Sequence, residues 1–186
     1  VTRGLSNPDL AALLINESQP TLRWMVGLGH ELELLYDGTV LADGQRKFPA
    51  TGLAAHPKDG GAGLIDCWLR IAKQKGIEVR LETRVTRLLV TERNAVCGVE
   101  ILGAHGRQEI NSKAVVLACG SFEANPKARA AYLGPNWDVA KVRGTRYNTG
   151  EGLDMALAIG AQPDGHWSSL HCSTIDASAP QMESKY

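Results

Sequence analysis

The fold class follows most directly from residues 113–121, which read Lys-Ala-Val-Val-Leu-Ala-Cys-Gly-Ser. Residues 114–118 form a continuous apolar run, which is typical of a strand buried on both faces, as in a parallel sheet. The run ends at Cys119-Gly120, where small residues let the backbone approach a ligand at the carboxyl edge of a sheet. The alternative for the run taken alone is a structural strand and turn without a ligand.

Residues 84–111, directly before this run, predict a three-stranded meander. The expected strands cover 85–90, 96–101 and 107–110, because each is rich in β-branched and apolar residues and is bounded by turn residues. The turns between them are expected at Arg93-Asn94 and at His105-Gly106.

A helix and a further strand are expected upstream of the meander. An apolar stripe of Leu64, Trp68 and Ile71 predicts a helix over 61–75. Residues 77–81 alternate as a strand, and a helix followed by a strand is half of a β-α-β unit. Further helices are expected from residues 6–9 to Gly27, with Pro20 interrupting the pattern, and at 125–133 and 150–159. The sequence therefore predicts a mixed α/β (α+β) fold.

Composition and charge narrow the class of protein. A chain of 186 residues and 20.0 kDa has room for one ordinary domain or for two incomplete ones. Its 20 Lys+Arg balance 20 Asp+Glu, which argues against a nucleic-acid partner, because such binders carry a basic excess. No apolar run approaches the roughly 20 residues that a membrane helix needs.

The cysteines and the two ends of the chain bear on its compartment and completeness. The 4 cysteines form no C-x-x-C pair, which favours reduced thiols in a cytoplasmic protein. His166, His171 and Cys172 fit no standard zinc spacing, so no metal site is expected. The chain starts at Val1 without a signal segment, and no helix or strand signal closes its end. We therefore expect an internal fragment.

Two further motifs could carry chemistry. Asn148-Thr-Gly-Glu-Gly152 opens a helix, so its free N–H groups could face an anion or a polar cofactor. The alternative is an ordinary helix start capped by Thr149. His171 stands in an apolar setting, where a lone histidine is more often a core residue than a ligand. Neither a G-x-G-x-x-G loop nor a Ser-His-Asp template is found.

The order and spacing of these features resemble the fumarate reductase and succinate dehydrogenase flavoprotein superfamily, and most closely the FAD-dependent tricarballylate dehydrogenases. Three segments carry the resemblance. They are Val-Val-Leu-Ala-Cys-Gly-Ser-Phe-Glu-Ala-Asn at 115–125, Val-Arg-Gly-Thr-Arg-Tyr-Asn-Thr-Gly at 142–150 and Leu-His-Cys-Ser-Thr-Ile-Asp-Ala-Ser-Ala-Pro at 170–180. The likeness covers nearly the whole chain, from about residue 7 to residue 181, and the middle segment is quite specific.

The resemblance implies a fold and a set of contacts. Residues 1–125 would be part of a Rossmann-like FAD-binding domain, and residues 126–186 the start of a substrate-capping domain. Val85 would contact the adenine ring through its backbone. The other implied cofactor contacts are Ala118, Cys119 and Gly120 near the ADP half, and Asn148, Thr149, Gly150, Glu151 and Gly152 near the flavin. His171 would hold a substrate carboxylate beside the flavin ring.

The sequence also departs from the family pattern. Glu151 stands where the family more often has Asp, and Cys119 and Ser121 replace a commoner Ala or Thr and a second Gly. Arg146 stands where close relatives often carry a small residue or proline. The glycine loop that cradles the FAD pyrophosphate and the region with the catalytic arginine are absent from this chain. Arg143 is not given that catalytic role.

The resemblance implies a fragment of an FAD-dependent dehydrogenase that oxidises a C–C bond of a polycarboxylate such as tricarballylate. The substrate would be a small carboxylate, and a membrane or iron-sulfur protein could accept the electrons. The isolated chain is expected to bind FAD weakly or not at all and to be inactive. Two alternatives stay open. One is another flavoprotein of the superfamily, either a 3-ketosteroid dehydrogenase or a precorrin-3B synthase-like protein. The other is a cofactor-free interaction domain.

Overall fold

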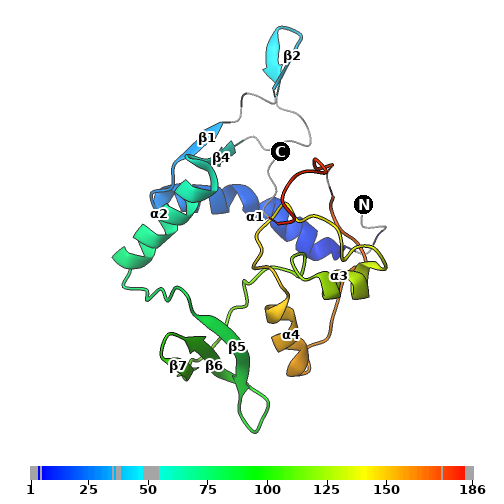
Figure 1. Ribbon diagram of the computed structural model, residues 1–186. Coiled ribbons are helices and arrows are strands. Elements are labelled where there is room, and N and C mark those ends of the chain that lie inside the picture. The colour runs from blue at the N-terminus through cyan, green and yellow to red at the C-terminus, as the bar shows by residue number, and fades with distance from the viewer. Residues whose placement is uncertain are drawn as a thin grey trace. The chain divides into compact units, whose positions relative to one another are not determined.

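The computed structural model describes residues 4, 6–34, 36, 39–47, 55–172 and 174–182. The chain forms two compact units, residues 8–81 and residues 82–186 together with 1–7. The expected mixed α/β character is confirmed, since helices and small antiparallel sheets occur in the described chain (Figure 1). The division at 125/126 into cofactor-binding and capping parts concerns the whole protein and stays a prediction.

The unit of residues 8–81 combines two helices with two small sheets. Its strand β1 pairs with β4, and β2 pairs with β3, both in antiparallel register. The β2–β3 hairpin turns at Asp43-Gly44, where both residues have positive φ (54° and 69°), as a tight hairpin requires. The elements are α1 (Pro8–Gly27), β1 (Leu32–Leu34), β2 (Val40–Ala42), β3 (Gln45–Lys47), β4 (Ala55–Pro57) and α2 (Gly60–Gln74).

Helix α1 differs from the expectation at Pro20, which lies inside one continuous helix. Proline lacks the N–H that would bond the carbonyl of Asn16, and this loss usually bends or ends a helix. No residue of α1 is buried, so the unpaired carbonyl faces solvent, where water can satisfy it. The cost of Pro20 is therefore small enough for the helix to continue to Gly27.

Helix α2 confirms the predicted helix over 61–75 and carries the core of its unit. Ile71 is buried, and Trp68 of the same stripe is half-buried. The Trp68 ring lies 4.4 Å from the ring of buried His30 and 5.8 Å from that of Trp24. These contacts join α2 to the end of α1.

The meander predicted for 84–111 is confirmed in the second unit (Figure 1). Strand β5 (Arg84–Val90) pairs with β6 (Val96–Gly103), which pairs with β7 (Gly106–Asn111), all antiparallel. The turns fall where they were expected, with positive φ at Asn94 (61°) and Gly106 (85°). Leu88 and Ile101 are buried on this sheet.

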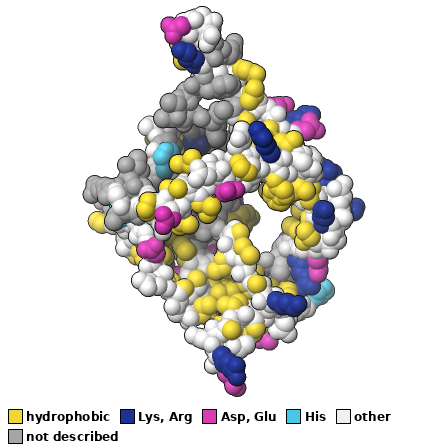
Figure 2. Space-filling model, turned by 180° about the vertical axis from the view of Figure 1, so that it is seen from behind, with side chains coloured by type: hydrophobic (Ala, Val, Ile, Leu, Met, Phe, Trp, Pro, Cys, Tyr) yellow, Lys and Arg dark blue, Asp and Glu magenta, His cyan; other side chains and the backbone are white. Residues whose placement is uncertain are grey.

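The strands expected at 77–81 and 114–118 are wrong for this structure, because neither segment is a strand. Among the described residues no segment pairs with either one, and a strand needs a neighbour for its hydrogen bonds. Leu81 and Val116 consequently stay 74% and 89% exposed. Apolar side chains lie at the surface in several places (Figure 2). The expected parallel, Rossmann-like sheet is not found in the described part of the chain.

Two short helices complete the second unit. They are α3 (Pro126–Leu133) and α4 (Glu151–Ala158), as predicted, and the residues after α4 are irregular. Near the C-terminal end, Val142 forms a parallel bridge to Met182, so the last described residues return to the segment after α3. None of the helices in the described ranges is long and apolar enough to cross a membrane.

Candidate functional site

Two loops of the second unit, residues 119–125 and 148–152, pack against each other through their backbones. The N–H of Ala124 donates to the carbonyl of Asn148 at 2.9 Å. Asn125 donates from its side chain to the carbonyl of Thr149 at 2.9 Å, and its Oδ1 accepts from the first turn of α3. One asparagine therefore caps α3 and ties the two loops together.

Glycines allow the close approach of these loops. Gly120 has a φ of +75°, and a Cβ there would lie 2.7 Å from Oδ1 of Asn148. A Cβ on Gly152 would overlap the sulfur of Cys119. The structure thus brings together Cys119, Gly120 and the 148–152 loop, which were predicted separately from the sequence. Their role toward a cofactor stays a prediction.

Glu151 connects the second loop to the meander. The Thr149 hydroxyl donates to Oε2 of Glu151, and Nη2 of Arg84 lies 3.1 Å from Oε1. The hydrogen bond from Thr149 is the main cause of a lowered pKa for Glu151, and partial burial opposes it. Gly150, with φ 92°, is the N-cap of α4, so the alternative of Thr149 as the cap is wrong. The Thr149 hydroxyl bonds the carboxylate instead.

Val85 lines the same cavity as Glu151. This cavity of about 490 Å³ lies between β5 and α4, and Arg84 and Met155 also contribute to its wall. No sequence pattern links Val85 to the 148–152 loop, because the rest of the meander, α3 and the segments around α3 lie between them. The fold places them on one cavity all the same.

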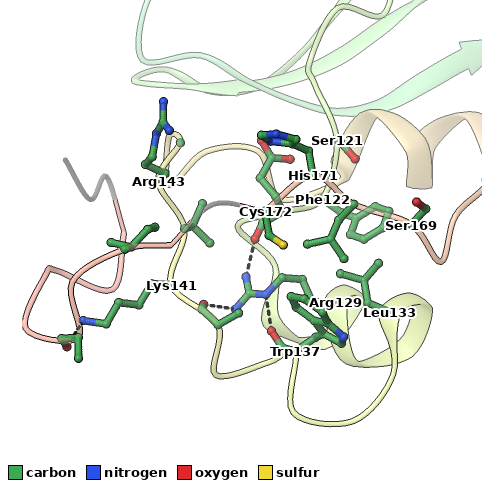
Figure 3. A pocket seen from close by; sticks show the side chains of 17 residues that line it. Ser121, Phe122, Arg129, Leu133, Trp137, Lys141, Arg143, Ser169, His171 and Cys172 are labelled. Atoms are coloured by element: carbon green, nitrogen blue, oxygen red, sulfur yellow. Dashed lines mark hydrogen bonds between the residues drawn. The ribbon is translucent and has the colours of Figure 1, made fainter. Parts of the chain in front are cut away.

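A second cavity, of about 710 Å³, contains His171 (Figure 3). Its walls come from the 121–123 segment, α3, Trp137, the 140–144 segment and residues 169–172, 175 and 177. Figure 3 shows Arg143, His171 and Ser121 along one side of the cavity and Arg129 with Trp137 along the other. The His171 side chain is exposed and makes no hydrogen bond to any residue that the structure describes. His171 is therefore a surface residue of the cavity and does not belong to the core.

Arg129 is a buried cation on α3 and supports one wall of this cavity. Its side chain is only 4% exposed. The guanidinium donates to four main-chain carbonyls, and no carboxylate of the described chain forms an ion pair with it. The acceptors are the carbonyls of Glu123 (2.5 Å), Trp137 (2.7 Å), Asp138 (2.7 Å) and Ala140 (3.3 Å). Arg129 thereby fixes the loop after α3 to the loop before it.

Lys141 holds the segment that follows His171. Its ammonium group donates to the carbonyls of Ala177 (2.6 Å) and Ala179. Gln181 adds a bond from its side chain to the carbonyl of Ala140 at 2.9 Å, and its own carbonyl accepts from Val142 at 2.9 Å. The 175–182 segment is thus attached to 139–142, and both segments contribute to the wall of the cavity.

The structure was also searched for side chains that could hold a metal ion. The described residues contain no group of three or more His, Cys, Asp or Glu side chains that could hold a metal ion. The four cysteines are free thiols.

Comparison with known protein families identifies the family to which this chain belongs. The model of the FAD binding domain family matches residues 1–168. This chain belongs to the FAD binding domain family.

Relatives of this FAD binding domain are oxidoreductases. The chain is 32% identical over 164 residues to a probable fumarate reductase of Shewanella frigidimarina, covering 87% of the chain and 27% of that protein. It is 35% identical over 107 residues to a 3-oxosteroid 1-dehydrogenase of Mycobacterium tuberculosis, covering 52% of the chain and 18% of the relative. A solved flavocytochrome c3 fumarate reductase in an open conformation is similar with a TM-score of 0.70 and 28% identity, over 87% of this chain and 28% of the other. The chain thus spans less than a third of these relatives.

The 114–120 segment of this FAD binding domain has backbone groups that suit a polar cofactor. Ala118, Cys119 and Gly120 are exposed, and the 114–120 backbone makes no hydrogen bond within the described chain. Backbone N–H and C=O groups left unpaired beside a glycine loop can bond a polar cofactor. The loop at 148–152 stands next to them, with its N–H groups at the start of α4. These residues could therefore line one side of an FAD molecule.

Replacing Gly120 by alanine is expected to destabilise the FAD binding domain and to lower its FAD content. An L-residue in the left-handed region costs about 1–2 kcal/mol. The new Cβ would in addition displace Asn148 from its 2.5 Å bond to Glu123. Thermal unfolding and the ratio of FAD to protein, both for the whole protein, measure the two effects.

Gly160→Ala is the matched control for Gly120→Ala. Gly160 also has positive φ (92°), but a Cβ there would meet nothing within 4 Å. We expect Gly160→Ala to lose only the stability that the left-handed φ costs an alanine, and to keep its FAD content. Equal unfolding temperatures and equal FAD content for the two variants would contradict a role for the close approach of Gly120 to the Asn148 side chain.

Proposed function

We propose that this chain is part of an FAD-dependent dehydrogenase that oxidises a saturated C–C bond of a small polycarboxylate such as tricarballylate. One observation supports the substrate class most strongly. The 710 Å³ cavity is lined by three cationic side chains, Arg129, Lys141 and Arg143, and by a single carboxylate, Glu123. The chain as a whole has no net charge, so this excess is local to the cavity. A cavity lined mainly by one sign of charge favours a ligand of the opposite sign.

His171 is the residue that we assign to substrate binding. Its imidazole is exposed to the cavity, and an N–H of that ring can donate to a carboxylate. A carboxylate held in this way fixes the orientation of the neighbouring C–C bond. Donation to an adjacent carboxylate also stabilises negative charge that develops when the carbon loses its proton. We assign the base for that proton to no residue of this chain.

The cofactor residues keep the roles that the resemblance implies. Bound FAD would supply the acceptor for the hydride. Ala118, Cys119 and Gly120 would hold its ADP half and Val85 the adenine. Asn148, Thr149, Gly150, Glu151 and Gly152 would lie near the flavin. The exposed backbone of 118–120 and its contact with the 148–152 loop support this assignment.

The organisation of the whole protein is part of the proposal. Residues 1–125 would contribute to a Rossmann-like FAD-binding domain, and residues 126–186 would begin a domain that caps the substrate. Reduced flavin would pass its electrons to a membrane or iron-sulfur protein. A cytoplasmic location agrees with four free thiols.

A second candidate function is oxidation of a ring ketone, as in a 3-ketosteroid dehydrogenase. Two observations favour it. The 3-oxosteroid 1-dehydrogenase named above has the higher sequence identity, although over a shorter stretch. The cavity wall also contains the apolar side chains of Phe122, Leu133 and Trp137.

Flavin reduction without oxygen separates these candidates. The whole protein that contains this chain is loaded with FAD and mixed with tricarballylate, succinate or a 3-oxosteroid, and flavin absorbance is followed. We expect tricarballylate to bleach the flavin. Bleaching by the steroid alone would support the second candidate. Protein that takes up no FAD would support a cofactor-free interaction domain.

A further inference from the structure

Glu123 lines the 710 Å³ cavity, and its carboxylate forms a hydrogen bond with the 148–152 loop. Its Oε1 accepts from Nδ2 of Asn148 at 2.5 Å. The same cavity is lined by three cationic side chains, yet no ion pair joins Glu123 to any residue that the structure describes. The carboxylate of Glu123 is therefore directed to Asn148 rather than to a positive charge.

Both partners of this bond are held in place through their backbones. Arg129 donates to the main-chain carbonyl of Glu123 at 2.5 Å, and the N–H of Ala124 donates to the carbonyl of Asn148 at 2.9 Å. The Asn125 side chain adds a further bond to the same loop. The two loops thus stay attached without the bond between the Glu123 and Asn148 side chains, so this bond is available for another role.

The bond to Glu123 decides which way round the Asn148 amide lies. An ionised carboxylate only accepts hydrogen bonds, so the amide has to present its NH₂ group to Glu123. The amide lies against Gly120, since Oδ1, Cγ and Nδ2 are 2.7, 2.8 and 2.9 Å from the place that a Cβ on Gly120 would take. Oδ1 has no hydrogen-bond partner in the described chain, and it is not buried. Asn148 thus offers an oriented acceptor beside Gly120.

We propose that Glu123 is a positioning residue for the cofactor, because it orients Asn148 so that Oδ1 accepts a hydrogen bond from a hydroxyl or N–H group of FAD. This inference rests on the function proposed above, which assigns FAD to the 118–120 and 148–152 loops. An acceptor selects a donor and disfavours an ionised phosphate, whose oxygens only accept. The Asn148 amide would therefore face a ribityl or ribose hydroxyl or a ring N–H of FAD, and not the pyrophosphate.

The test measures the Kd for FAD of the whole apoprotein by flavin fluorescence, with thermal unfolding of the apoprotein in parallel. Glu123→Ala leaves the Asn148 amide free to turn and should raise the Kd by roughly 2- to 10-fold, the range for one neutral hydrogen bond. Glu123→Gln can pair with Asn148 in either orientation, because both amides donate and accept. With half of the molecules in the wrong orientation, the Kd should rise about twofold. The unfolding temperature of Glu123→Gln should stay unchanged, because one hydrogen bond is kept.

Exchanging the two side chains tests the polarity of the bond. Asn148→Asp alone sets two carboxylates against each other and should weaken FAD binding more than Glu123→Ala does. The double variant E123Q/N148D restores a donor and an acceptor with their roles exchanged, and it keeps an acceptor beside Gly120. The double variant should recover most of the FAD affinity that Asn148→Asp loses, which is the coupling expected of a direct pair.

Glu92→Gln is the matched control, because Glu92 is an exposed glutamate in the β5–β6 turn and lines none of the cavities described above. Its Kd for FAD should equal that of the unchanged protein. An unchanged Kd in Glu123→Ala would overturn the inference, and so would a double variant that binds FAD no better than Asn148→Asp. A lower unfolding temperature of Glu123→Gln without a change in Kd would overturn it too, since Glu123 would then be structural. Failure of the proposed function looks different, because FAD would bind normally and tricarballylate would not bleach it.

Discussion

Alanine at His171 should lower kcat/KM on a polycarboxylate by roughly 10²- to 10³-fold, the cost of one donor that stabilises developing charge. The content of bound FAD should stay the same. The structure gives the reason for this separation of effects. His171 is exposed on the cavity, and its side chain bonds no described residue, so its removal leaves no buried group unpaired. Steady-state kinetics and flavin absorbance of the whole protein measure the two quantities.

Two further variants make the His171 experiment decisive. His171→Gln keeps an N–H donor and should retain part of the activity that alanine loses. His105→Ala is the control, because His105 is an exposed histidine in the β6–β7 turn, outside the cavity. Parallel losses of FAD and activity in His171→Ala would show that the histidine supports the fold rather than the substrate.

Much of the local structure followed from the sequence because its causes are local. The meander of β5, β6 and β7 has alternating strands, and Asn94 and Gly106 adopt the positive φ that their turns need. Helix α3 begins within one residue of the expected start at 125, since Asn125 caps it and Pro126 suits the first turn. In each case the residues that specify the element also lie within it.

The expected strands at 77–81 and 114–118 failed for the opposite reason. Their apolar patterns specify burial between neighbours, and a strand exists only when those neighbours supply hydrogen bonds. In the described chain the neighbours are not supplied, and Val116 is almost fully exposed. The apolar pattern of 114–118 therefore predicts burial between two neighbouring strands, and these residues have no such neighbours in the described chain.

The candidate site was only partly visible in the sequence. The glycines of the 148–152 loop and the small residues at 118–120 marked it, because close backbone approach needs small side chains. Arg129 and Lys141 were missed. Both bond main-chain carbonyls, and because every residue carries a carbonyl, such bonds leave no pattern in the sequence. From the sequence alone, a basic residue on a helix such as Arg129 is as consistent with a solvent-exposed side chain as with a buried one.

Replacing Arg129 by alanine should destabilise the region around α3 by about 3 kcal/mol or more, because each buried carbonyl left without a donor costs about 1–3 kcal/mol. Four carbonyls lose the guanidinium at once; those of Trp137 and Ala140 keep a second donor, whereas those of Glu123 and Asp138 keep none among the described residues. The removed side chain also leaves a void against Trp137. The cavity that contains His171 loses one wall in the same step. Activity should therefore fall together with stability, in contrast to His171→Ala.

Hydrogen exchange of the α3 amides in the whole protein measures the Arg129 effect locally, since it reports the free energy of opening for that helix. Lys127→Ala on the same helix is the control, because Lys127 is exposed and its loss should change the opening free energy by less than about 0.5 kcal/mol. Arg129→Lys tests geometry, because three donors on one nitrogen cannot reach four carbonyls that a planar guanidinium spans. If α3 had the same opening free energy in Arg129→Lys as in the unchanged protein, the positive charge alone would account for the role of Arg129. Exchange in Arg129→Ala as slow as in Lys127→Ala would contradict the structural role of the four bonds.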